Sequence, residues 1–137
     1  MIIVSACLAG IKCNYLGDDS SHPEVVELVR KGLAIPVCPE QLGGLPTPRI
    51  PAEIQGRKVM NKNGEDVTLN FQKGAEETLR IAKLVNCKKA ILKANSPSCG
   101  LGKIYDGSFS GKLIPGNGIT TELLMKNGIE IITETDL

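Results

Sequence analysis

The sequence predicts an α/β fold, a three-layer, Rossmann-like open parallel sheet of about four strands with flanking helices and a small hairpin excursion. Two observations carry this prediction. Short apolar runs rich in β-branched residues alternate with segments of helical periodicity, which is the order typical of parallel sheets with crossover helices. The 137 residues also have the length of one ordinary domain. We therefore expect residues 1–137 to form a single α/β domain.

The first half of the chain supplies two strands and the helix between them. Residues 2–6 are apolar on both faces, as in a buried parallel strand. The segment SHPE at 21–24 has the S-x-x-E form of a capping box and predicts a helix that ends at Gly32. Residues 33–37 predict a second strand. Because Pro36 cannot donate a ladder hydrogen bond, this strand lies at a sheet edge or its pairing stops there.

The second half supplies the hairpin, two helices and two more strands. The Asn-Gly pair at 63–64, between two runs that contain apolar residues, predicts the hairpin turn. Apolar residues recur every three or four positions over 68–86, which predicts an amphipathic helix. Residues 89–93 and 129–133 predict the third and fourth strands, and Asn117 is the expected cap of the helix before the last strand.

Composition excludes several classes of function. The net charge of +1 offers no general field for a nucleic-acid polymer or an anionic membrane. No apolar run approaches the roughly 18 residues that span a bilayer, and no basic flank precedes the apolar start. Five cysteines, an odd number, indicate the reducing cytoplasm and thiols that serve as ligands or nucleophiles rather than disulfides.

Three of the five cysteines follow predicted strands. Cys7, Cys38 and Cys99 each leave a strand in the same direction, and the carboxyl ends of parallel strands share one sheet edge. We therefore expect the three sulfurs to meet there. Cys13 lies in the loop after Cys7, close to the expected site, whereas Cys87 precedes the third strand and is expected at the opposite edge as a small buried apolar residue.

Three convergent thiolates suit either zinc or an iron–sulfur cluster. A closed structural zinc site usually draws four ligands in C-x-x-C pairs, whereas each cysteine here comes from a different loop. The single histidine, His22, is explained by its place at a helix start. The residues alone leave both metals open, and three ligands leave one metal position free for a substrate atom.

Five segments of the chain together resemble a known family: SACLAG, CPEQLGGLPTPR, GEDVT, SPSCG and YDGSFSGKLIPGNGIT. That family is the domain of unknown function 523 family, whose characterised members are thiouracil desulfidases. The resemblance runs from Ile3 to about Leu124. It implies a [4Fe-4S] cluster held by Cys7, Cys38 and Cys99, with the fourth iron free.

The same resemblance implies an enzyme and its substrate class. The expected reaction is the non-redox hydrolysis of a C=S group in a thiolated pyrimidine, or a related thioamide, to a carbonyl plus sulfide. Glu40 matches the family's catalytic carboxylate and would act as general base, and Ser96 matches a serine that assists at the site. The implied partner is a small thiolated heterocycle.

Other polar residues near the expected site have two interpretations each. Arg49 and Lys93 are candidates to hold a pyrimidine oxygen or to balance the negative charge of the cluster, and a solvated surface role is equally open. Ser98 is a weaker substrate-binding candidate, because a hydroxyl in such a turn often bonds only to backbone. Glu40 could simply pair with Arg49 or cap a turn.

The segment GSFSGKLIPGNG has the composition of a phosphate-binding loop but not the spacing of one. Tyr105, Phe109 and Ile114 in this region could instead form one wall of the pocket and offer a flat contact to a heterocycle.

Two other functions stay open from the sequence. One is a non-catalytic metal-binding module, either a zinc site or an iron–sulfur sensor in which Cys13 is the fourth ligand. The other is a small Rossmann-like binding protein in which the cysteines are incidental.

Overall fold

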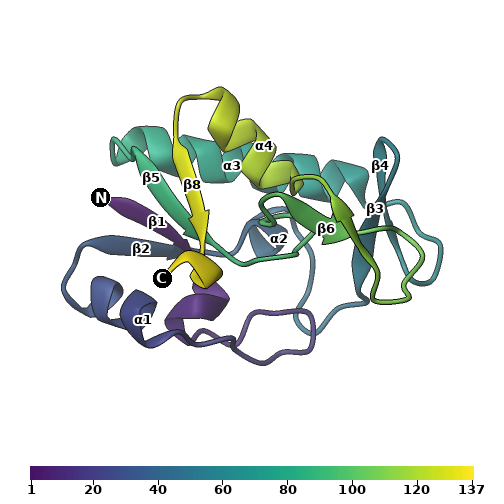
Figure 1. Ribbon diagram of the computed structural model, residues 1–137, viewed down its shortest axis with the longest axis horizontal. Coiled ribbons are helices and arrows are strands. Elements are labelled where there is room, and N and C mark those ends of the chain that lie inside the picture. Colours follow the sequence, from purple (N-terminus) through teal and green to yellow (C-terminus); the bar gives the residue numbers. More distant parts are fainter.

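The computed structural model describes all residues, 1–137. Its main sheet has four parallel strands in the order β2-β1-β5-β8 (Figure 1). The strands are β1 (Ile2–Ser5), β2 (Ala34–Val37), β5 (Lys89–Leu92) and β8 (Glu130–Thr133). All four strands were predicted within a residue or two, and β2 is an edge strand, as Pro36 requires.

Helices cover both faces of this sheet. Helix α1 (Pro23–Arg30) lies on one face, and α3 (Thr68–Leu84) and α4 (Ile119–Lys126) lie together on the other (Figure 1). Two buried clusters fill the two interfaces. Ile3 and Leu124 belong to one, and Val4 and Val25 belong to the other, because successive residues of a strand point to opposite faces. The three-layer prediction is therefore confirmed.

Two antiparallel hairpins stand beyond one end of the main sheet (Figure 1). One pairs β3 (Ala52–Gln55) with β4 (Lys58–Asn61), and the other pairs β6 (Lys103–Tyr105) with β7 (Leu113–Pro115). The predicted turn at 63–64 is present, and an antiparallel bridge between Met60 and Asp66 closes it. The pairing of β3 with β4, which turns between Gln55 and Lys58, and the hairpin of β6 and β7 were not predicted.

Both predicted helix caps are wrong by one residue. The cap of α1 is His22, not Ser21, because the His22 Nδ1 atom accepts a hydrogen bond from the Glu24 N–H at 3.3 Å. The cap of α4 is Gly118. Asn117 instead accepts a hydrogen bond from the Gly102 N–H at 2.8 Å, so its side chain joins two loops.

Three short helical turns complete the chain, and the sequence predicted none of them. They are η1 (Ala6–Ala9), α2 (Pro39–Leu42) and η2 (Glu134–Asp136). The first two carry residues of the expected site, because Cys7 lies in η1 and Glu40 in α2. None of the helices is both long and apolar enough to cross a membrane.

Candidate active site

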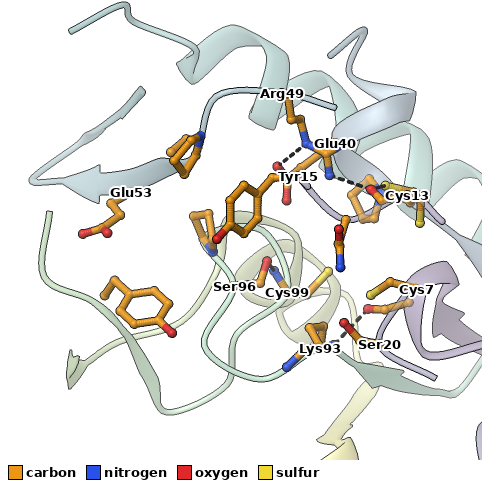
Figure 2. Close-up of a pocket in the computed structure, with 18 of the residues that line it drawn as sticks. Cys7, Cys13, Tyr15, Ser20, Glu40, Arg49, Glu53, Lys93, Ser96 and Cys99 are labelled. Carbon is orange, nitrogen blue, oxygen red and sulfur yellow. Dashed lines mark hydrogen bonds and ion pairs between the residues drawn. The ribbon is translucent and has the colours of Figure 1, made fainter. Parts of the chain in front are cut away.

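A cavity of about 460 Å³ opens at the edge of the main sheet where β1, β2 and β5 end (Figure 2). The two hairpins form its opposite wall. In an open parallel sheet this edge is the usual place for a ligand, since the loops that leave the strands converge there. The cavity is thus in the position that the topology predicts.

Four of the five cysteines line this cavity, namely Cys7, Cys13, Cys38 and Cys99. Each of the three predicted ligands leaves a different strand: Cys7 follows β1, Cys38 caps α2 after β2, and Cys99 lies in the loop after β5. The expected convergence of the three is therefore observed. Cys87 lies outside the cavity, buried in the main core, where its thiol donates to the Lys89 carbonyl at 3.0 Å.

The separation of the possible ligand side chains distinguishes a site for a single metal ion from a site for a cluster. No three His, Cys, Asp or Glu side chains stand close enough together to hold a single metal ion. A mononuclear zinc site therefore has no preformed ligand set. Cysteine sulfurs spread around a cavity are the donor type and arrangement that a multi-iron cluster takes, because such a cluster is bound through several of its irons.

The thiols differ in how readily they ionise. A hydrogen bond from Cys13, together with the Gln41 backbone N–H and the Arg49 charge, lowers the pKa of Cys38 to about 6, although burial opposes this change. Burial raises the pKa of Cys7 to about 11 and that of Cys99 to about 12. Cys38 is thus the thiol best prepared to bind a metal at neutral pH.

Glu40 and Arg49 form an ion pair at the cavity wall, with 3.0 Å between Arg49 Nε and Glu40 Oε1 (Figure 2). The Arg49 side chain is only 5% exposed and donates to three further acceptors: the Cys13 carbonyl at 2.8 Å, the Thr47 hydroxyl and the Pro46 carbonyl. The pairing of Glu40 with Arg49 that the sequence allowed is present. No protein group donates to Glu40 Oε2, so this oxygen remains available in the cavity.

Ser96 also lines the cavity, beside Cys99 (Figure 2). Its Oγ atom accepts hydrogen bonds from the backbone N–H groups of Ser98 at 3.1 Å and Cys99 at 3.0 Å. Both acceptor positions of the hydroxyl are then occupied, whereas its proton has no protein acceptor. Ser96 is therefore arranged to donate a hydrogen bond into the cavity.

Lys93 lines the cavity as predicted, and its ammonium group lies 2.7 Å from Glu134 Oε2. The other oxygen of Glu134 accepts the Ala94 backbone N–H at 2.7 Å. The short helix η2 therefore holds the segment that follows β5. Because an ammonium group has three N–H donors, Lys93 can pair with Glu134 and still donate into the cavity.

Ser98 does not line the cavity. Its side chain is buried, and its hydroxyl lies 2.9 Å from the Thr120 hydroxyl of α4. Ser98 thus fastens the loop after β5 to a helix, which corrects the expectation that it binds substrate. Ile114, expected in the pocket wall, is also outside the cavity, whereas Tyr105 and Phe109 do line it.

Three further residues, Tyr15, Ser20 and Glu53, line the cavity and were not predicted from the sequence (Figure 2). Tyr15 and Ser20 lie in the loop after η1, and the Ser20 backbone N–H donates to the Cys7 carbonyl at 2.9 Å. Glu53 is a buried carboxylate on β3. The burial of Glu53 could not be inferred from the sequence, because a glutamate in a short hairpin normally faces solvent.

Comparisons with known proteins place this geometry in a family. The family model described as 2-thiouracil desulfurase matches residues 2–136. The uncharacterized protein YbbK of Bacillus subtilis (strain 168) is 46% identical over 147 aligned residues, which cover 100% of this chain and 97% of YbbK. The solved structure of the [4Fe-4S]-dependent thiouracil desulfidase TudS matches with a TM-score of 0.95 and 45% identity, over 99% of this chain and 91% of that one. The chain therefore belongs to the 2-thiouracil desulfurase family.

Proposed function

We propose that this protein is a non-redox desulfidase that converts the C=S group of a thiouracil-like pyrimidine to a carbonyl and releases sulfide. The observation that carries the proposal is one cavity in which three cysteines from three strand ends face a carboxylate with a free oxygen. Membership of the 2-thiouracil desulfurase family, and the similarity to a protein named as a thiouracil desulfidase, support the substrate class.

Cys7, Cys38 and Cys99 are the residues that would hold a [4Fe-4S] cluster. Thiolates are the ligands that such clusters use, and these three side chains line one cavity. When bound through three cysteines, the cluster supplies an iron that is free to act as a Lewis acid toward a thiocarbonyl sulfur. All five cysteines are free thiols, which supports the reducing cytoplasm as the location of the protein.

In this proposal Glu40 is the general base. Its Oε2 atom accepts a proton from the attacking water, while Arg49 holds Oε1 at 3.0 Å and so fixes the plane of the carboxylate. A fixed carboxylate matters because a catalytic group misplaced by about 1 Å can cost roughly 100-fold in rate. Arg49 is therefore a positioning residue, since nearly all of its own donors are already used.

Ser96 and Lys93 provide hydrogen-bond donors to the substrate. The Ser96 hydroxyl has an unused proton, and two backbone N–H groups orient its oxygen. Lys93 can offer an N–H to a pyrimidine oxygen while it remains paired with Glu134. These donors suit a neutral heterocycle with an exocyclic oxygen.

The experiment is anaerobic reconstitution followed by an assay of sulfide release from 2-thiouracil and 4-thiouracil. We expect a brown protein with about four irons per chain. Cys7→Ser, Cys38→Ser and Cys99→Ser should lose the cluster. Glu40→Gln should keep the iron and lose roughly 100-fold or more in rate, the usual contribution of a general base.

Cys87→Ser is the matched control, because this thiol is buried away from the cavity and a serine hydroxyl can replace its hydrogen bond to Lys89. This variant should keep both iron and turnover. A reconstituted wild-type protein that binds only zinc, or that binds iron and releases no sulfide from either base, would overturn the proposal.

A further inference from the structure

One buried carboxylate at the cavity has no part in the mechanism above. Glu53 lies on β3, on the side of the cavity opposite Cys7 and Cys13 (Figure 2), and is 8% exposed. Its Oε1 atom accepts two backbone hydrogen bonds, from Gly107 at 2.9 Å and from Phe109 at 3.2 Å. Both donors belong to residues 106–112, which join β6 to β7 and are called here the wall loop.

A second side chain of β3 binds the same loop. Gln55 Nε2 donates to the Gly107 carbonyl at 2.7 Å. Glu53 and Gln55 point to the same side of the strand, since they are two residues apart. Both the N–H and the C=O of Gly107 are therefore held by β3. The fit is close, because a Cβ on Gly107 would lie 2.8 Å from the Ile54 carbonyl oxygen.

The wall loop presents Phe109 to the cavity in an unusual backbone conformation. Phe109 lines the cavity and has a positive φ of 57°. A bulky residue adopts this left-handed region only where its surroundings hold it there. The hydrogen bond from the Phe109 N–H to the Glu53 carboxylate is a direct restraint of that kind, and a charged acceptor strengthens it.

We propose that Glu53 is a positioning residue that acts through Phe109: it fixes the wall loop so that the Phe109 ring packs on the face of a flat thiolated heterocycle. The proposal rests on the desulfidase function for its substrate. Glu53 would therefore govern affinity for the heterocycle and leave the chemistry at the cysteines and Glu40 unchanged. Aromatic side chains supply the flat apolar contact that such a ring needs.

Steady-state kinetics of the reconstituted enzyme with 2-thiouracil test this role. Glu53→Ala should raise KM roughly 10-fold and keep kcat within about threefold, because it removes binding and not a transition-state contact. Glu53→Gln should be close to wild type, since its amide oxygen can accept the same two N–H bonds. A fall in kcat that is equally large in both variants would overturn the proposal, because it would place the Glu53 charge in the chemistry.

A double-mutant cycle tests whether Glu53 acts through Phe109. Phe109→Ala should raise KM by itself, and Glu53→Ala added to it should have little further effect. Additive effects on KM would contradict the proposal. If Glu53→Ala does not fold, Gln55→Ala is the alternative variant, because it removes the hydrogen bond from Gln55 to the Gly107 carbonyl of the same loop. It should also raise KM. An unchanged KM would count against the proposal that β3 holds the wall loop in place.

A fluorescence measurement separates this inference from the proposed function. The chain has no tryptophan, so Phe109→Trp gives a single probe at the cavity wall. Adding Glu53→Ala should shift its emission to longer wavelength, as the ring becomes more hydrated, and Glu53→Gln should not. This readout needs no turnover. Absence of sulfide release would overturn the desulfidase function alone. An emission wavelength that Glu53→Ala leaves unchanged would overturn the role of Glu53 in positioning residue 109.

Discussion

Gly74 in α3 lies directly against the backbone carbonyl of Pro39, the residue that separates Cys38 from Glu40. A Cβ on Gly74 would stand 1.9 Å from that carbonyl oxygen. Gly43, at the end of α2, packs equally closely against α3, because a Cβ on Gly43 would stand 2.0 Å from the Asn70 carbonyl oxygen. Helices α2 and α3 thus meet backbone to backbone, and this contact sets where Cys38 and Glu40 stand.

Gly74→Ala should destabilise the protein, although the same change in an ordinary helix interior stabilises it by roughly 1 kcal/mol. The added methyl group must push α2 away from α3, and overpacking of this kind costs about 1–3 kcal/mol. The free energy of unfolding from denaturant titration measures the change. Iron content and sulfide release should also fall, because the displaced segment carries a ligand and the base.

Gln72→Ala is the matched control for this helix, since Gln72 is exposed on α3 two residues away. It should change stability little and keep full iron content. If Gly74→Ala were as stable and as active as wild type, the backbone contact would not position the site.

Gly74 also shows why part of the fold could not be predicted from the sequence. The apolar spacing over 68–86 predicts the helix, whereas by helix propensity alone a glycine at position 74 is only destabilising. Glycine is required at position 74 because the backbone of α2 packs against it, and α2 is distant in sequence and was itself not predicted. Local propensity contains no information about such a contact, so α2 and its packing had to come from the structure.

Arg49→Lys should lower kcat by roughly 10-fold while the iron content stays normal, because lysine cannot reproduce the planar fork of arginine. Arg49 connects Glu40 Oε1 to the Cys13 carbonyl, with distances of 3.0 Å and 2.8 Å. A lysine reaches one of these acceptors and leaves the carboxylate free to rotate. Steady-state sulfide release, normalised to iron, measures the effect.

Arg80→Lys is the control for Arg49→Lys. Arg80 also pairs with a glutamate, Glu77, at 3.2 Å, but its side chain is 68% exposed and lies on the outer surface of α3. An exposed pair of this kind contributes little. Equal losses of activity in the two variants would show that Arg49 has no specific role at the site.

Lys93→Met should raise KM for 2-thiouracil roughly 10-fold, since it removes a hydrogen-bond donor to the substrate oxygen. Glu134→Gln is the comparison, because it weakens the ion pair with Lys93 but keeps an acceptor for the Ala94 N–H. That variant should leave KM near its wild-type value. If Lys93→Met changes stability and not KM, the lysine serves only to anchor η2.

The part of the site that could be predicted from the sequence consists of residues that come soon after a strand of the parallel sheet. Cys7, Cys38 and Cys99 could be assigned to one edge because parallel strands share a direction. Ser98 was misassigned because the sequence does not reveal which of two neighbouring hydroxyls faces inward, and Thr120, its partner, is distant in sequence. Glu53 was missed because its burial depends on the unpredicted hairpin of β6 and β7.

Three of the cavity thiols, Cys7, Cys38 and Cys99, should react with iodoacetamide at very different rates in cluster-free protein. Alkylation requires the thiolate, and the pKa of Cys38 is lowered to about 6. Cys38 is therefore mostly ionised at pH 7, and its rate should rise as the pH increases through about 6 and then level off. Burial raises the pKa of Cys7 to about 11 and that of Cys99 to about 12, so both remain protonated and slow.

Peptide mapping by mass spectrometry after brief labelling gives the order of reaction, and Cys13→Ala tests its cause. The hydrogen bond from Cys13 is the largest influence that lowers the pKa of Cys38. Without it, the pH at which Cys38 labelling reaches half of its maximum should rise, while Cys7 and Cys99 stay slow. Labelling of Cys7 or Cys99 before Cys38 would contradict the assignment of Cys38 as the thiol that is ionised in advance of metal binding.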